Sequence, residues 1–350
     1  MKTVLSLLAV LLLPSTSVVW AEETVVPYAL TTSEELELVG FPLRLACLDH
    51  GPVISVSTPL VVWTPRFLQT PFGQALQEER SYYAEVVAPP NHPWLGHRFE
   101  LDETATRART DHALVAESSG LNTRGLPAAD LAGATLEVRP HLTVPFWAQD
   151  TIERRVICGG EKSETFEFYL PLPNGGTLSV VPSVSAGGAT GWLDQVSAQP
   201  LSAGRLLIPP GSAVGVKFGQ KSGLAVGLTG ASRKTPVAKP LSAGFNFASY
   251  PYPHDMRLGL DWGGPSSGFR GATSPRGADR IEICVGLRRV AYSPESSSES
   301  GTLRWRMVNP ARRHEWKQPA EYLDQIPVGH GFLIWKNQPD SNHFFYPPKP

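Results

Sequence analysis

Glu100 and Asp102 are the acidic pair whose spacing best suits catalysis. Residues 98–102 alternate polar and apolar side chains, which predicts a strand with both carboxylates on one face. Two residues along a strand span about 6.6 Å, and inverting glycosidases hold their carboxyl groups about 6.5–9.5 Å apart. The pair therefore permits polysaccharide hydrolysis. Every alternating strand with a solvated face contains such pairs, however, and a solvated face is the interpretation we favour.

Other motifs of catalysis and metal binding are incomplete. Gly264–Gly268 matches Gly-x-Ser-x-Gly, but Pro265 precedes the serine and no helical pattern follows, so the context of a nucleophile elbow is missing. His92, His97 and Glu100 offer three zinc ligands from one turn, yet no HExxH helix accompanies them. Phosphate-binding glycine loops and calcium loops are absent from the sequence. We therefore predict no catalytic residue, no metal and no cofactor.

Four aromatic residues at turns are the candidate ligand contacts. Trp192 lies in a glycine-rich turn, Trp262 precedes two glycines, and Tyr250 and Tyr252 flank Pro251. Such side chains combine an apolar face with a polar tip and stack on sugar rings. They are therefore candidates for binding a glycan. Packing within turns and cores is the interpretation we favour.

Hydrophobicity with a period of two dominates the chain and is typical of half-buried strands. The clearest examples are residues 98–102, 135–139, 164–170 and 302–307. The chain has 32 glycines and 33 prolines, which supply the turns between strands. The helical patterns are short and cover Phe72–Arg80, Ala128–Leu131 and Ala320–Ile326. The sequence thus predicts an all-β fold of antiparallel sheets in a sandwich or barrel.

An ordered series of short motifs occurs twice in the chain. The first copy runs from Leu131 to Gly211 and the second from Leu241 to Gly329. Each contains Pro-His, Trp, Ile-Cys, Tyr, Trp and Ile-Pro-x-Gly in that order. This order predicts a duplicated β unit. We expect a signal peptide at 1–21, an N-terminal β segment at 22–125, β unit A at 126–230 and β unit B at 231–350.

The chain has three cysteines, Cys47, Cys158 and Cys284, and none is in C-x-x-C spacing. Cys158 and Cys284 hold equivalent places in the two series, which makes them the candidate disulfide if their Cα atoms lie within about 7 Å. The alternative is that all three thiols are small buried apolar side chains.

The first 21 residues have the parts of a secretory signal. Lys2 is the basic n-region, Val4–Leu13 is the apolar h-region, and Val19 and Ala21 suit the positions before a cleavage site. The apolar run is half the length of roughly 20 residues that spans a bilayer. We therefore predict an exported protein, secreted, periplasmic or on the cell surface, with no transmembrane segment after cleavage.

The net charge and the composition limit the classes of function that the chain can have. The 31 Lys and Arg residues against 32 Asp and Glu residues give a net charge of −1, so no overall field attracts nucleic acid. The basic stretch Arg304–Lys317 contains Trp305, but alternation points Trp305 inward and the arginines outward. We predict an exported non-catalytic protein, a structural or ligand-binding module of a surface or envelope. Its partner would be a glycan or a cell-envelope component, and nucleic acid is excluded. The alternative is a secreted polysaccharide-active hydrolase.

Overall fold

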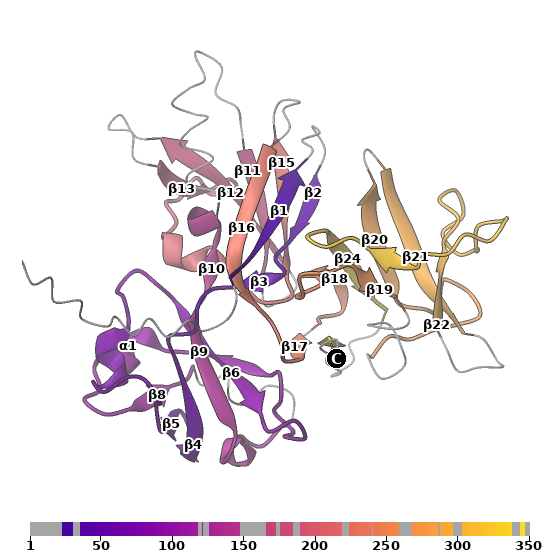
Figure 1. Ribbon diagram of the computed structural model, residues 1–350. Helices are drawn as coiled ribbons and strands as arrows, with labels where there is room; N and C mark the ends of the chain where they lie inside the picture. Colours follow the sequence, from indigo (N-terminus) through magenta and orange to yellow (C-terminus); the bar gives the residue numbers. More distant parts are fainter. Residues whose placement is uncertain are drawn as a thin grey trace, which may run out of the picture.

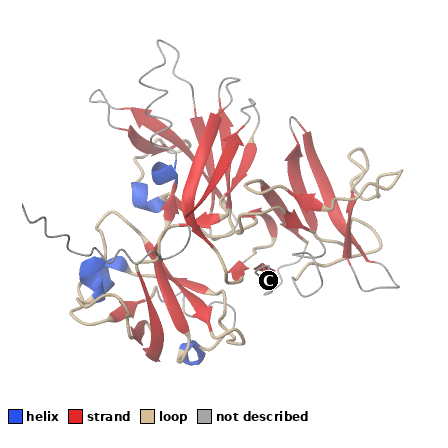
Figure 2. Cartoon of the chain, viewed as in Figure 1, coloured by secondary structure: helices blue, strands red, loops and turns tan. Residues whose placement is uncertain are grey.

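The computed structural model consists almost entirely of β-strands joined by turns (Figures 1 and 2). It describes residues 23–30, 36–117, 121, 126–147, 166–172, 176–184, 190–218, 224–239, 241–258, 268–285, 288–296, 303–337 and 344–346. Neighbouring strands of the three largest sheets run antiparallel. The predicted all-β, antiparallel fold is confirmed.

Three large sheets carry the fold. The N-terminal sheet, in the order β7-β6-β9-β4-β5-β8, contains β4 (Asp49–Ser57), β5 (Leu60–Trp63), β6 (Tyr82–Ala88), β7 (Arg98–Glu100), β8 (Ala113–Val115) and β9 (Thr135–Pro140). The middle sheet, in the order β13-β12-β11-β15-β2, contains β2 (Glu37–Gly40), β11 (Phe166–Pro171), β12 (Thr177–Val184), β13 (Thr190–Asp194) and β15 (Ala213–Phe218). The C-terminal sheet, in the order β18-β24-β20-β21-β22, contains β18 (Gly244–Ser249), β20 (Arg280–Val285), β21 (Arg288–Ser296), β22 (Leu303–Met307) and β24 (Gly331–Lys336).

Shorter elements connect these sheets. A three-stranded sheet orders β1 (Glu23–Leu30), β16 (Leu224–Ser232) and β3 (Leu43–Arg44) as β1-β16-β3. Three two-stranded ladders pair β10 (Leu142–Thr143) with β14 (Leu207–Ile208), β19 (Met256–Arg257) with β23 (Gln325–Ile326), and β17 (Val237–Lys239) with β25 (Phe344–Tyr346). The short helices include α1 (Glu103–Arg107), η1 (Phe72–Ala75), η3 (Ala128–Leu131) and η4 (Ala203–Arg205).

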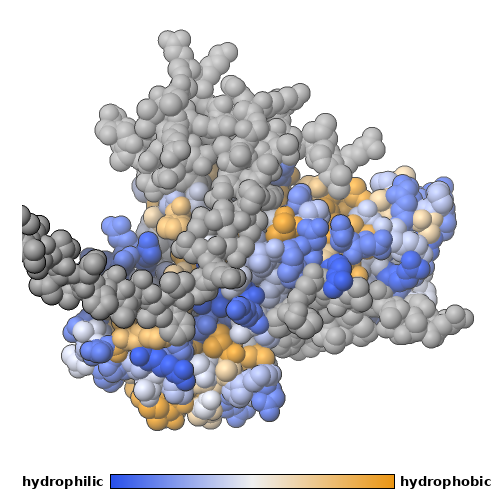
Figure 3. Space-filling model, viewed as in Figure 1, coloured by the Kyte–Doolittle hydropathy of each residue, from blue (hydrophilic) through white to orange (hydrophobic). Residues whose placement is uncertain are grey.

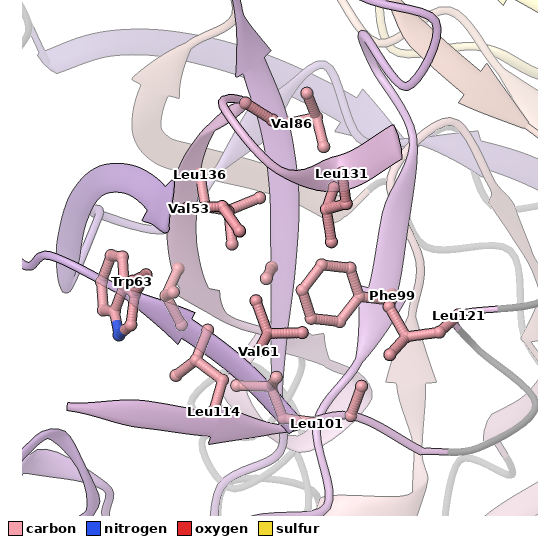
Figure 4. Close-up of a cluster of buried hydrophobic side chains, with 14 of the residues drawn as sticks. Val53, Val61, Trp63, Val86, Phe99, Leu101, Leu114, Leu121, Leu131 and Leu136 are labelled. Carbon is pink, nitrogen blue, oxygen red and sulfur yellow. The ribbon is translucent and has the colours of Figure 1, made fainter. Parts of the chain in front are cut away.

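Alternating residues bury one face of each strand, as the pattern predicts. In β9, Leu136 and Val138 are fully buried while Thr135 and Glu137 are only partly so. Their side chains join a core on the N-terminal sheet, part of which Figure 4 shows, with Phe99 and Val61 among its members. In β22, Trp305 is buried next to the exposed Arg304, so the predicted inward tryptophan is confirmed. Figure 3 shows hydrophilic residues over much of the described surface on the C-terminal side.

The predicted helices are only partly confirmed. Ala128–Leu131 forms the 3₁₀ helix η3, but the helix predicted over Phe72–Arg80 ends at Ala75, because the Gln77 amide donates to the Tyr82 hydroxyl at 3.0 Å instead of a helix carbonyl. Ala320–Ile326 is not helical. Its backbone pairs with neighbouring segments, as in the bonds from the Met307 amide to Glu321 and from the Leu323 amide to Trp305.

Several sheets contain strands that are distant from one another in the sequence. β9 follows residue 126 in the chain, yet it lies between β6 and β4 of the N-terminal sheet. β2 and β3 precede that sheet in sequence but pair with β15 and β16. The N-terminal sheet is thus enclosed in sequence by strands of the other sheets, whereas the division of the chain into independently folding parts stays a prediction.

The middle and C-terminal sheets have the same strand order. Counted from one edge, the middle sheet has the order β13-β12-β11-β15-β2, and the C-terminal sheet has the order β22-β21-β20-β24-β18. Strands at the same place in these two orders also come in the same sequence order within their sheets. Each sheet is accompanied by a two-residue ladder that precedes a glycine with positive φ, Gly211 at 74° and Gly329 at 78°. The register also agrees, since Gly40 lies opposite Ala213 and Ser249 lies opposite Gly331.

The two sheets meet through reciprocal backbone contacts. The Gly40 amide donates to the Gly329 carbonyl at 2.7 Å, and the Ser249 amide donates to the Gly211 carbonyl at 3.0 Å. Each bond therefore joins the last residue of one edge strand to the glycine turn of the other sheet. Such reciprocity is typical of a contact with two-fold symmetry.

Gly331 allows the closest approach in this contact. A Cβ atom at position 331 would lie 2.5 Å from the Ala213 Cβ and 2.9 Å from the Leu38 carbonyl carbon. Gly331→Ala should therefore lower the free energy of unfolding by about 1–3 kcal/mol through overpacking. Gly191→Ala is the matched control, because its nearest contact is 3.6 Å away in an ordinary strand. Chemical denaturation measures both, and equal stability of the two variants would show that the sheets do not meet in this way.

Candidate functional site

Five charged side chains are gathered where the N-terminal sheet meets the sheet of β1, β16 and β3. This buried charge cluster consists of Arg44, Glu85, Glu137, Arg139 and Arg233. The side chains of Glu85 and Arg233 are each 2% exposed, and Glu137 is the most exposed at 22%. Charges so far from water require close partners.

The cluster is held by ion pairs and hydrogen bonds. Arg233 pairs with Glu85, whose carboxylate also accepts the Thr235 hydroxyl at 3.2 Å. Arg139 donates from Nη2 and Nε to one oxygen of Glu137 at 2.7 and 3.1 Å. Arg44 Nη1 approaches Glu137 at 2.8 Å. Residues from four separate stretches of the chain thus share one network.

Local backbone features bring these stretches together. β3 pairs with β16, which places Arg44 beside the end of β16, just before Arg233. At Gly230 a Cβ atom would lie 2.8 Å from the Arg44 carbonyl oxygen, so glycine permits this approach. Gly96, at φ 76°, lets the N-terminal sheet approach the Pro236 carbonyl, and the Ala238 amide donates to the Gly96 carbonyl at 2.9 Å.

The electrostatics of the cluster follow from its burial. Burial opposes ionisation of Glu137, but Arg44 and Arg139 outweigh it and hold the Glu137 pKa below its usual range. Burial lowers the pKa of Arg44, and the neighbouring Arg233 and Arg139 lower it further. Burial raises the pKa of the Cys47 thiol to about 11, so this thiol is protonated at neutral pH.

Glu100 and Asp102, the predicted acidic pair, have separate roles. β7 ends at Glu100, whose carboxylate bonds to His141 and lies 3.5 Å from Arg98 Nε. Asp102 is the N-cap of α1 and accepts the Ala105 amide at 2.8 Å. The predicted strand through Asp102 therefore stops short, because the capping bond begins a helix there. Asp is among the preferred N-cap residues, and this is the sequence signal for the start of this helix.

The His141–Glu100 pair does not extend to a nucleophile. Burial opposes ionisation of Glu100, yet His141 and Arg98 hold its pKa below the usual range. The Ser81 hydroxyl, which lies on the neighbouring strand segment, donates to the Gly204 carbonyl at 3.1 Å. Among the described residues, no group accepts or donates at His141 Nδ1. A relay of the Ser-His-acid type is therefore not assembled at this position.

A second pair that sequence reasoning missed is Ser212 and Lys239. Lys239 Nζ donates to Ser212 Oγ at 2.6 Å, and the Ser212 carbonyl accepts the Ser249 hydroxyl at 2.8 Å. Serine and lysine form the nucleophile and base of some hydrolases. Here both residues are buried, at 2% and 6% exposure, and neither lines the cavity beside Arg44 and Arg233. No sequence motif links positions 212 and 239, so only the fold reveals this contact.

The predicted ligand-binding aromatics are packed inside the protein. Trp192, Tyr250 and Tyr252 are 5%, 3% and 2% exposed. Trp192 lies edge-on to Phe168 at 5.6 Å, and the Tyr252 hydroxyl donates to the Thr235 carbonyl at 3.0 Å. These placements favour the packing alternative. Trp262 lies outside the described residues.

The predicted disulfide and metal groups are only partly described. Cys284 is half-buried and Cys158 lies outside the described residues, so their bridge stays a prediction. His92 Nδ1 accepts the Trp94 amide at 3.1 Å. Within the described ranges, no three His, Cys, Asp or Glu side chains are placed to hold a metal ion. The serine of Gly264–Gly268 also lies outside those ranges.

Two other buried acids, Asp49 and Asp279, accept hydrogen bonds from backbone amides. Asp49 accepts the amides of Arg66 at 3.0 Å and Leu68 at 2.7 Å. Asp279 accepts the Asn337 amide at 3.1 Å and the Lys336 ammonium at 2.6 Å. These carboxylates fix loops and strand ends, which is a scaffold role.

No protein-family model matches the chain, and neither a curated protein nor a solved structure is significantly similar to it. In the described part of the chain, no helix has the length and apolar composition needed to cross a bilayer.

The ion pair of Arg233 with Glu85 should be strongly coupled to folding. Arg233→Met leaves the Glu85 charge buried without its guanidinium, which typically costs about 3–5 kcal/mol of unfolding free energy. Arg312→Met removes a solvent-exposed pair with Glu315, where Arg312 is 67% exposed, and should cost at most about 1 kcal/mol. Urea denaturation compares the two, and a loss below about 1 kcal/mol for Arg233→Met would contradict the structural role of the cluster.

Acid should destabilise the protein partly through Glu137. Its folded pKa is lowered below the ordinary value of about 4.3, so the unfolded state binds more protons in that window. The stabilisation is therefore complete above about pH 4.3 and is lost as the pH falls through the folded pKa. Tm measured from neutral to acidic pH should fall less steeply for Glu137→Gln than for the natural chain. Glu79→Gln, at an exposed position, should leave the slope unchanged; identical slopes for all three proteins would refute the assignment.

Proposed function

We propose that this chain is an exported β protein without catalytic activity that serves as a structural or ligand-binding module of a surface or envelope. The observation that carries the proposal is the use of its buried ionisable groups. Each charged side chain of the cluster is paired with another one inside the molecule. The carboxylates of Asp49 and Asp279 are likewise bound to groups of the protein. The polar chemistry described above thus joins segments of the fold to one another.

The packed aromatic residues support the structural part of this proposal over the ligand-binding part. Trp192 and Tyr252 have their rings in cores, where they cannot also cover a sugar. A glycan or envelope component would contact other residues. The hydrolase alternative loses its original support, since Glu100 and Asp102 are bound to different partners.

We further propose that the middle and C-terminal sheets are two copies of one β unit. The same strand order, the same register beside the glycine turns and the reciprocal hydrogen bonds support this. In this scheme β2 begins the first copy and β10 continues it, so the N-terminal sheet is an insertion between them. A duplicated scaffold suits a structural role, because an enzyme rarely needs its chemistry twice.

Export is the part of the proposal that is simplest to test. The full chain, produced in a secreting bacterial host, should be cleaved between Ala21 and Glu22 and leave the cytosol. Mass spectrometry of its N-terminus measures this. Leu8→Arg places a charge in the apolar run and should block export, whereas Thr3→Arg adds the same charge to the basic n-region and should not.

An uncleaved chain in the cytosol, or equal behaviour of Leu8→Arg and Thr3→Arg, would overturn the exported assignment. Either result would leave the fold unaffected, because the described residues begin after the proposed signal.

A further inference from the structure

A small cavity lies beside the buried charge cluster. Its walls include Arg44, Arg233 and Tyr83, and the rest is apolar, with several prolines such as Pro42 and Pro210. The space amounts to about 20 Å³, which suits one particle of about the size of a water molecule. A sugar ring or a large cofactor does not fit in this space.

Two guanidinium groups have N–H atoms without a partner at this place. Arg44 Nε and Arg233 Nη2 are buried, and no described residue accepts a hydrogen bond from either. The two side chains are 9% and 2% exposed. An unpaired buried donor costs about 1–3 kcal/mol and more when it is charged, so such groups normally have a bound acceptor.

The cluster also has an excess of positive charge. Three arginines face two glutamates, which leaves a net charge of +1. Burial raises the pKa of Tyr83, Tyr252 and the Cys47 thiol, so these three groups are neutral. The Asp49 carboxylate keeps its own charge and binds the amides of residues 66–68, apart from the five side chains that define the cluster.

We propose that this cavity binds one small monovalent inorganic anion of the halide class, such as chloride. An anion accepts from Arg44 Nε and Arg233 Nη2 and balances the remaining charge, whereas water supplies only the hydrogen bonds. The apolar walls reduce screening and strengthen the attraction. Guanidinium groups are weakly hydrated, so they give up water for such a partner more readily than lysine does.

The bound anion would stabilise the junction of the sheets. Arg44 belongs to β3, Arg233 follows β16, and both reach glutamates of the N-terminal sheet. The cavity exists only in the folded chain, so anion binding raises folded-state stability by mass action. This inference does not depend on export or on the absence of catalysis.

Thermal unfolding of the full chain, at constant ionic strength in chloride or in the bulky anion gluconate, tests the proposal. Chloride should raise Tm by about 2–4 °C relative to gluconate. Arg44→Met makes the cluster neutral, with two arginines facing two glutamates, and should abolish the chloride effect. Arg312→Met removes an equal charge from the surface and should retain it.

A second measurement does not depend on the folding of any variant. Crystals of the natural chain grown in bromide should give an anomalous peak within hydrogen-bond distance of Arg44 Nε and Arg233 Nη2. The absence of that peak overturns the proposal and leaves water as the occupant. A chloride effect of equal size in the natural chain and Arg44→Met also overturns it, because the stabilising anion then binds elsewhere.

Discussion

The charges buried between the N-terminal sheet and the strands β3 and β16 must be neutralised, and much of the architecture depends on this. Glu85 and Arg233 lie 148 residues apart in sequence and are almost fully buried. Neither is tolerated there alone, because an unpaired ion in a low-dielectric interior costs several kcal/mol. The pairing therefore couples the folding of segments that are distant in the chain. Glycines at 96 and 230 permit the close backbone approach that makes it possible.

A second constraint is the contact between the middle and C-terminal sheets. The small residues Gly331, Ala213 and Gly40 allow the backbones to approach until the Gly40 and Ser249 amides reach the opposite glycine turns. If the two sheets are copies of one unit, as proposed, this contact is an internal version of a symmetric dimer interface. The N-terminal sheet then fits between β2 and β10 without disturbing it, because the two ends of the insertion come together at the charge cluster, where Arg44 lies 2.8 Å from Glu137.

Most polar side chains that could take part in catalysis instead hold the fold together. Asp102, which the sequence offers as a catalytic carboxylate, caps a helix, and the buried Asp49 binds loop amides. Ser212 and Lys239 make a contact that hydrolases also use, but they do so in a buried joint. The charge cluster differs from these pairs because its three arginines outnumber its two glutamates. Two of its arginines, Arg44 and Arg233, line a cavity and have N–H groups without a partner among the described residues, and this is why we propose a ligand there.

The amino-acid sequence alone determined the strands, because alternation such as that of Leu136 and Val138 depends only on neighbours two residues apart. It also identified Trp305 as an inward side chain for the same reason. It could not determine where β9 pairs, that Asp102 would end a strand, or that Trp192 and Tyr252 would be buried. The charge cluster was equally invisible, since Arg44, Glu85 and Arg233 share no motif. Only the tertiary structure decided these matters, because pairing between distant segments depends on which backbones come close enough to exclude water.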